Sequence, residues 1–249
     1  MAEHAQADDS GPAAPGSVAP ARRRSPLPGL VVTLLVASLL VGGAWALLGT
    51  QGYHSPRGIQ VARRLGTAVV DGRVLPHVAL SFSTYPFASG TSGGEAVHPG
   101  GNSTWPTIGP TPDFQVPAHA LVTVTVHQFD GGAALDDPWF AFVRGTVGDV
   151  ATVDGRVVRS VDPNQVAHTF LLQSLPGASS AFLVNVPLPD VPGNAYADDG
   201  AYRTIVFSFV SGPKGTYVWN CEFPCGQMVA RFGSAMSTLG YMSGYVHVV

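Results

Sequence analysis

The sequence is poor in charge and especially poor in lysine. Only 12% of its 249 residues are charged, and a single lysine, Lys214, accompanies the arginines. Apart from three consecutive arginines at 22–24, no basic patch is larger than an arginine pair, so the electrostatic footprint of nucleic-acid binding is missing. The glycine-rich stretch at 90–101 lacks the lysine and the strand-to-helix context of a phosphate-binding loop. These absences exclude nucleic acids as partners and P-loop nucleotide chemistry.

A helical period is also missing beyond residue 49, whereas turn-forming residues are abundant. The chain has 30 glycines and 21 prolines, and its 45% of hydrophobic residues is ample for a buried core. Short apolar stretches at regular spacing are typical of all-β domains. We expect strands at residues 77–87, 114–126, 165–172, 181–186, 204–210, 216–220 and 244–249. The sequence therefore predicts an all-β sandwich or Greek-key barrel.

Two hairpin turns can be placed in the sequence. Asp71-Gly72 and Asp154-Gly155 each lie between short stretches rich in valine. Asp-Gly favours a type I′ turn, because both central residues of that turn have positive φ. Each pair therefore predicts a tight connection between antiparallel strands.

One long hydrophobic run lies near the N-terminus. Residues 30–49 carry no charge, and at about 1.5 Å per residue they are just long enough for about 30 Å of hydrocarbon. The preceding arginines favour a cytoplasmic N-terminus. We expect a disordered cytoplasmic segment at 1–29, a single transmembrane helix at 30–49, a tether and first strand at 50–75, and an extracytoplasmic domain at 76–249. The alternative is a cleaved signal peptide, since residues 44–46 (Ala-Trp-Ala) have the form of a cleavage site.

The soft donor side chains are concentrated at the C-terminal end. Cys221 and Cys225 are the only cysteines, and every methionine after the first residue follows them: Met228, Met236 and Met242. Thiolates and thioethers select copper, and the strand around His168 offers an imidazole. The alternative is a structural disulfide with methionines that fill the core.

The order of these residues resembles the cupredoxins, in particular the copper domain of cytochrome c oxidase subunit II. The similarity covers about residues 110–249. It includes His168-x-Phe170, the Gly-Thr-Tyr segment at 215–217 that leads to Cys221, and the C-terminal Met-Ser-Gly-Tyr-Val-His-Val segment. The resemblance implies a cupredoxin-like Greek-key β-sandwich that holds one or two copper ions. It implies metal ligands at His168, Cys221, Cys225, Met236 and Met242.

The sequence departs from the dinuclear copper motif at several positions. Val229 and Phe232 stand where that motif has a histidine and a methionine, and no histidine follows until near the C-terminus. The second imidazole is therefore missing from its usual place. His98, in a long loop, is a candidate replacement, whereas His127 and His247 alternate with valines and are expected to point away from the core.

The resemblance implies a membrane-anchored extracytoplasmic protein that passes electrons and has no independent catalytic activity. Its partner would be a redox protein such as a cytochrome or a membrane oxidase. Two alternatives remain open: a copper capture and delivery protein, and a metal-free interaction domain in which the two cysteines form a disulfide. A cysteine nucleophile is not expected, because two closely spaced cysteines outside the cell oxidise together unless a metal holds them.

Overall fold

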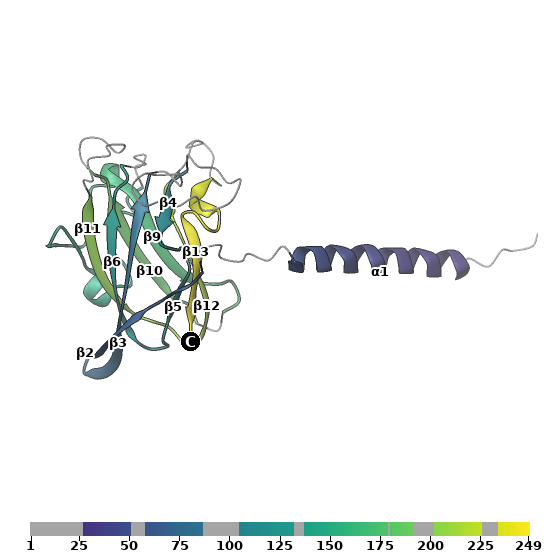
Figure 1. Ribbon diagram of the computed structural model, residues 1–249, viewed down its shortest axis with the longest axis horizontal. Coiled ribbons are helices and arrows are strands. Elements are labelled where there is room, and N and C mark those ends of the chain that lie inside the picture. The colour runs from purple at the N-terminus through teal and green to yellow at the C-terminus, as the bar shows by residue number, and fades with distance from the viewer. Residues whose placement is uncertain are drawn as a thin grey trace, which may run out of the picture. The chain divides into compact units, whose positions relative to one another are not determined.

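The computed structural model divides the chain into two units, Met1–Gly52 and Tyr53–Val249. The residues it describes are 27–50, 58–86, 105–131, 137–178, 180–191, 202–225 and 234–249 (Figure 1). His98, Met228, Val229 and Phe232 lie outside the described residues. Each unit is considered by itself below.

The described part of the first unit is a helix, α1 (Leu27–Thr50), which covers the stretch where the sequence predicts a helix. Side chains are described for residues 31–43, and all of them are exposed. A search of the described residues finds no helix with both the length and the hydropathy needed to cross a membrane.

The second unit is a sandwich of two β-sheets. The first sheet has the strand order β1-β5-β13-β12-β9-β10, and the second has the order β2-β3-β6-β11-β7-β8, with β4 paired to β3. The strands of the first sheet are β1 (Gln60–Val61), β5 (Phe114–Val116), β13 (Ser243–Val248), β12 (Gly215–Asn220), β9 (Val166–Ser174) and β10 (Leu183–Pro189). Those of the second are β2 (Arg63–Val70), β3 (Arg73–Tyr85), β4 (Thr107–Gly109), β6 (Leu121–Gln128), β11 (Arg203–Val210), β7 (Ala151–Val153) and β8 (Arg156–Val158). In the connections that the structure describes lie three short 3-10 helices: η1 (Val147–Asp149), η2 (Pro163–Gln165) and η3 (Ala235–Ser237).

The predicted all-β sandwich is therefore confirmed, and both predicted hairpins are present. β2 pairs with β3 across Asp71-Gly72, and β7 pairs with β8 across Asp154-Gly155. All four turn residues have positive φ, between 49° and 79°. This is the backbone geometry that makes Asp-Gly a hairpin signal.

The single strand expected at 114–126 is wrong. The segment forms two strands that belong to different sheets, because β5 pairs with β13 while β6 pairs with β3 and β11. Pro117 lacks the N–H that a continuous ladder needs, and His119 has a φ of 51°. The chain therefore crosses from one sheet to the other between these two residues.

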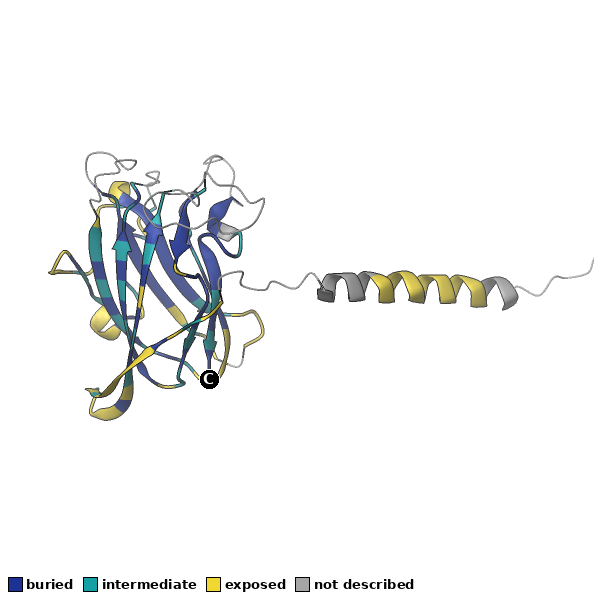
Figure 2. Ribbon diagram, in the orientation of Figure 1, coloured by how far each residue is buried: buried dark blue, intermediate teal, exposed yellow. Residues whose placement is uncertain are grey.

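Much of the length of the central strands is buried (Figure 2), and the core between the two sheets is rich in aromatic side chains. Trp219 of β12 stacks on Phe170 of β9 at 5.3 Å between ring centroids, and Phe82 and Phe114 pack beside them. The indole Nε1 of Trp219 donates a hydrogen bond of 2.6 Å to the carbonyl oxygen of Pro112. All the strands and the described core residues belong to the second unit. The sandwich therefore needs nothing before Tyr53 to build its core.

Candidate metal centre

The candidate site lies at one end of the first sheet, where three strands begin or end together. β9 runs antiparallel to β12, with Leu171 opposite Asn220, and β12 runs antiparallel to β13, with Asn220 opposite Ser243. This register places the end of β12 beside the start of β13 and beside the middle of β9, so that the first residues of β9 continue past the end of β12 next to the segment that follows it. Cys221 follows β12 directly, and its backbone N–H donates a hydrogen bond of 2.9 Å to the carbonyl oxygen of Met242. Strand pairing thus gathers residues that are far apart in the sequence.

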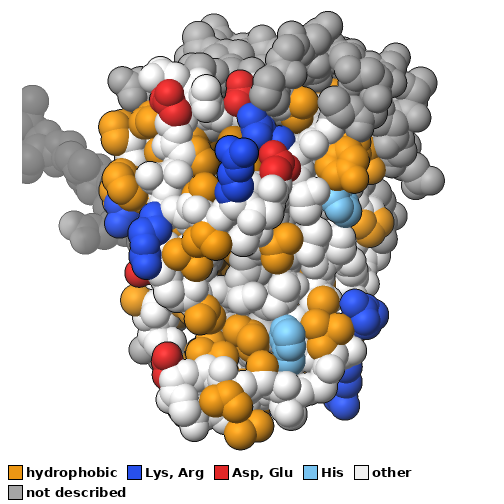
Figure 3. Space-filling model, turned by 90° about the vertical axis from the view of Figure 1, so that its left-hand side faces the viewer, with side chains coloured by type: hydrophobic (Ala, Val, Ile, Leu, Met, Phe, Trp, Pro, Cys, Tyr) orange, Lys and Arg blue, Asp and Glu red, His pale blue; other side chains and the backbone are white. Residues whose placement is uncertain are grey.

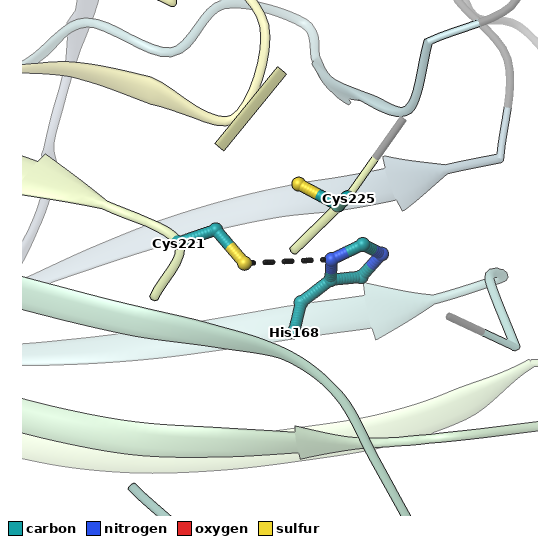
Figure 4. Close-up of side chains that lie close together, drawn as sticks. All are labelled: His168, Cys221 and Cys225. Carbon is teal, nitrogen blue, oxygen red and sulfur yellow. Dashed lines mark hydrogen bonds between the residues drawn. The ribbon is translucent and has the colours of Figure 1, made fainter. Parts of the chain in front are cut away.

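His168 faces the interior of the sandwich beside Cys221. It is the third residue of β9 and shares a face with Phe170 and Leu172, because side chains alternate along a strand. Its Nδ1 lies 3.6 Å from Cys221 Sγ, and both residues are fully buried (Figure 4). The imidazole and the thiol therefore meet inside the protein, away from bulk water.

Cys225 completes a cluster of three potential metal ligands. The ligand atoms of His168, Cys221 and Cys225 all lie within 4.8 Å of one another, and all three side chains are buried. Figure 4 shows the three side chains converging on one small region between β9 and the segment after β12. Both cysteines are free thiols. The structure thus brings together three of the five residues that the resemblance implies as ligands.

The other two implied ligands, Met236 and Met242, lie in the hydrophobic cluster that surrounds the cysteines. That cluster contains Cys221, Cys225, Met236 and Met242, and Met242 is fully buried. The N–H of Met242 donates a hydrogen bond of 3.1 Å to the carbonyl oxygen of Ala235, which begins η3. Both methionine side chains therefore come from one short segment and pack in the same cluster as the cysteines.

Aromatic side chains separate the cluster from solvent. Phe223 is fully buried, and its ring packs edge-on against Phe140 at 6.3 Å between centroids. Its carbonyl oxygen lies 3.4 Å from Cys221 Sγ. On another side, Trp105 packs edge-on against Tyr241 at 5.1 Å between centroids. This enclosure lowers the local polarity and strengthens the interactions between charges inside the site.

Asp130 is the residue of the site that sequence reasoning missed. Its Oδ2 lies 2.7 Å from His168 Nε2, and the two residues are almost completely buried. Asp130 follows β6 at the same end of the sandwich, and its carbonyl oxygen accepts a hydrogen bond of 2.8 Å from Gln128 Nε2. Gln128 in turn accepts a hydrogen bond from Thr84 of β3. The only sequence signal was a buried imidazole in need of a partner for its second nitrogen, and that signal does not say which carboxylate supplies it.

These contacts shift the proton affinities of the imidazole and of both thiols. Burial by itself lowers the pKa of His168, but the adjacent Asp130 carboxylate and the Cys221 sulfur raise it to about 10. Burial raises the pKa of Cys221, but hydrogen bonds from Cys225 and His168, together with the imidazolium charge, hold it well below its usual value. Burial and the negative charge on Cys221 raise the pKa of Cys225 well above its usual value. The metal-free site at neutral pH therefore holds an imidazolium, one thiolate and one thiol.

The other histidines in the described part of the chain lie away from this cluster: His77, His119, His127 and His247. His127 packs edge-on against Tyr202, and His247 Nδ1 lies 3.4 Å from the hydroxyl of Thr216. Both alternate with buried valines of their strands, as expected. Among the described residues, His168 is the single imidazole of the site.

Comparisons with known proteins give matches only among solved structures. A scan against protein-family models found no match, and a search of curated proteins found none. Auracyanin A, described as a "blue" copper protein from Chloroflexus aurantiacus, aligns with 70% of this chain and 99% of its own, at 13% identity and a TM-score of 0.32. Rusticyanin from Thiobacillus ferrooxidans aligns with 75% of this chain and 88% of its own, at 15% identity and a TM-score of 0.30.

Auracyanin B gives similar values, with 12% identity and a TM-score of 0.31 over 74% of this chain and 96% of its own. With TM-scores this low, the alignments do not define the fold or the site of this chain. Those descriptions rest on the strand pairing and on the side-chain geometry given above.

Proposed function

We propose that this chain is a copper-binding electron-transfer protein of cupredoxin type. The observation that carries the proposal is the convergence of His168, Cys221 and Cys225, with all ligand atoms within 4.8 Å of one another in a buried site. The motif resemblance of residues 110–249 supports it. So does the sandwich, which places the cysteine segment, the histidine strand and Met242 at one end.

The donor set fits copper. Two thiolates and an imidazole are soft to intermediate ligands, and the thioethers of Met236 and Met242 lie in the same cluster. Asp130 accepts a hydrogen bond from His168 Nε2, which would leave Nδ1 free to face a metal beside Cys221. His168, Cys221 and Cys225 would hold the ion, with one or both methionines as weaker ligands.

When bound, copper would supply one-electron exchange. The protein's own contribution is to hold the donors in a fixed arrangement and to keep water away. Cys221 is tied to Met242 through the backbone, and Glu222 N–H donates a hydrogen bond of 2.8 Å to Thr169 Oγ1. The cysteine segment is therefore anchored to both neighbouring strands. A rigid site of this kind needs little rearrangement when the charge of its ion changes.

Copper capture and delivery is the second candidate function. The observation that favours it is the single imidazole among the described residues, combined with two buried thioethers. Such a donor set suits Cu(I) better than Cu(II). An electron carrier would be intensely coloured when oxidised, whereas a Cu(I) carrier would be colourless.

We also propose that the chain is anchored in the cell membrane by a single pass, with the sandwich on the extracytoplasmic side. The support comes from the uncharged run at 30–49 and the arginines that precede it. A redox protein such as a cytochrome or a membrane oxidase would then be the partner. Attachment of the full chain to the membrane in cell fractions, and its resistance to extraction by high salt, tests this part of the proposal.

The test of the metal function uses the fragment 53–249, because the sandwich core is complete within it. The fragment is reduced, loaded with Cu(II), and examined for metal content and for visible and EPR spectra. We expect bound copper and an intense thiolate-to-copper absorption band, and the hyperfine pattern will distinguish one copper from a mixed-valence pair. Tight binding of colourless Cu(I) alone would favour the delivery function. Preference for zinc, or a disulfide with no bound metal, would contradict both.

A further inference from the structure

The β2–β3 hairpin projects from the end of the sandwich opposite to the metal-site cluster. In Figure 1 it forms the lower tip of the domain, while the segment around η3 and the start of β13 lies at the upper end. β2 is an edge strand of its sheet, with β3 on one side and no other described strand beyond it. The hairpin therefore presents a sheet surface that the described part of the sandwich does not cover.

One face of this hairpin is apolar and exposed. Val69 lies directly opposite Val74 in the strand register, so the two side chains share a face, and each is 70% exposed. The next pair on that face, Thr67 and Pro76, is also exposed. Leu65 adds a further large apolar side chain at 43% exposure. Exposed valines paired at a projecting tip form a small apolar contact surface.

Arginines lie on both faces of the hairpin: Arg73 pairs with Val70 and Arg63 with Ala79, on the face opposite to the paired valines, whereas Arg64 pairs with Val78 on the valine side. Arg63, Arg64 and Arg73 are exposed, and none forms an ion pair with any residue that the structure describes. The hairpin carries one acidic residue, Asp71. Figure 3 shows hydrophobic side chains at the lower end of the molecule, with Lys or Arg side chains at its margin. The hairpin is thus basic within a chain whose net charge is -3.

We infer that the β2–β3 hairpin docks onto anionic phospholipid headgroups. Apolar side chains flanked by arginines are the combination that binds a membrane interface, because the valines enter the headgroup region while the arginines pair with lipid phosphates. A second copy of this chain is a poorer occupant, since a two-fold contact would set two hairpins with the same excess of positive charge against each other. Negative charge on the partner is therefore required, and an anionic lipid surface supplies it.

The hairpin lies at the end of the sandwich opposite to the metal-site cluster (Figure 1). Docking would therefore turn that cluster away from the lipid, toward a partner in solution.

Sedimentation of the fragment 53–249 with sucrose-loaded vesicles tests this inference without the helix and without copper. The vesicles contain either phosphatidylcholine alone or phosphatidylcholine with phosphatidylglycerol at about 30%, which gives an anionic surface. We expect binding only to the anionic vesicles, and release at high salt because screening weakens the charge attraction. Removing two arginines (R63Q/R73Q) should weaken binding on the order of 25-fold, about fivefold for each charge. Polar replacement of the paired valines (V69S/V74S) should also weaken it.

The matched control removes two exposed positive charges at the opposite edge of the same sheet, R156Q/R159Q in and after β8, and should retain binding. Circular dichroism and the number of titratable thiols establish that each variant is folded. The inference is overturned if the fragment does not sediment with anionic vesicles, or if the control variant loses as much binding as R63Q/R73Q. It is also overturned if light scattering shows a dimer that V69S/V74S dissociates, because the face would then be a contact between copies. The inference makes no use of the metal proposal, so either can fail alone.

Discussion

Asp130 Oδ2 lies 2.7 Å from His168 Nε2 in the interior of the sandwich, across the gap between the two sheets. The pair orients the imidazole so that Nδ1 lies 3.6 Å from Cys221 Sγ. A carboxylate behind a histidine ligand fixes the tautomer of the ring and raises its basicity. Asp130 therefore acts through His168 as a positioning residue, and it is the natural first target for mutation.

Asp130→Asn should weaken copper binding by about 10-fold to 100-fold. The number of copper ions bound per protein molecule should not change. An amide can still form a hydrogen bond to the imidazole, but it removes the negative charge that favours the ligating ring. A titration against a competing chelator measures the change. Asp71→Asn, in the exposed β2–β3 turn, is the matched control and should bind copper like the unaltered protein. Equal affinities for all three proteins would show that Asp130 has no role in binding.

Removing any of the three clustered donors should lower copper affinity by more than about 100-fold. This exceeds the usual effect of removing a residue that only hydrogen-bonds to a metal ligand. The variants are Cys221→Ser, Cys225→Ser and His168→Ala, and the same competition assay applies. His127→Ala is the control for the histidine, because that ring packs against Tyr202. Unchanged copper stoichiometry in both cysteine variants would place the metal elsewhere.

The two methionines should differ in their effect. Met242 is fully buried and accepts the backbone hydrogen bond of Cys221 through its carbonyl oxygen, so we expect it to lie nearer the ion than Met236. Met242→Leu lowers the number of donors, and because Cu(I) accepts fewer ligands than Cu(II), the loss should destabilise Cu(II) more and raise the reduction potential, on the order of 60 mV for a tenfold change in relative affinity. Met236→Leu should change it less. Voltammetry of the copper-loaded fragment measures both, and a larger shift in Met236→Leu would reverse this assignment.

The reduced, metal-free protein should contain one thiolate at neutral pH. The pKa of Cys221 lies well below its usual value and that of Cys225 well above it, because the first sulfur faces His168 and accepts a hydrogen bond from the second. The ultraviolet absorbance of the thiolate should therefore disappear in Cys221→Ser. In Cys225→Ser it should largely remain. An equal loss in the two variants would mean that the negative charge is not localised on Cys221.

Copper affinity should rise with pH through the neutral range. His168 has a pKa of about 10 and the pKa of Cys225 is raised by burial and by the Cys221 sulfur, so at neutral pH both carry protons that a bound ion must displace. Each released proton makes the affinity rise about tenfold per pH unit. The logarithm of the copper affinity should therefore rise by about two for each pH unit in the unaltered protein, and by about one in Cys225→Ser. A pH-independent affinity would contradict the charge states assigned to the site.

Local patterns in the sequence determined most of the secondary structure. Alternating valine and threonine predicted β6, and Asp-Gly predicted two hairpins, because both signals depend only on neighbouring residues. The segment 114–126 shows the limit of such reasoning. Its apolar pattern continues through the point where the chain changes sheets, and only the pairing of β5 with β13 and of β6 with β11 separates the two strands.

The candidate site, too, was predicted partly from the sequence and decided partly by the tertiary structure. The sequence alone identified His168, Cys221, Cys225, Met236 and Met242 by their chemistry and by a family resemblance. Only the tertiary structure brought Asp130 to His168, because their contact depends on how the second sheet packs over the first. It likewise decided that Val69 and Val74 remain uncovered at a projecting tip, although their pattern predicts a strand like any other. Residue type and local spacing determine which side chains are available, whereas strand register and sheet packing determine which of them meet.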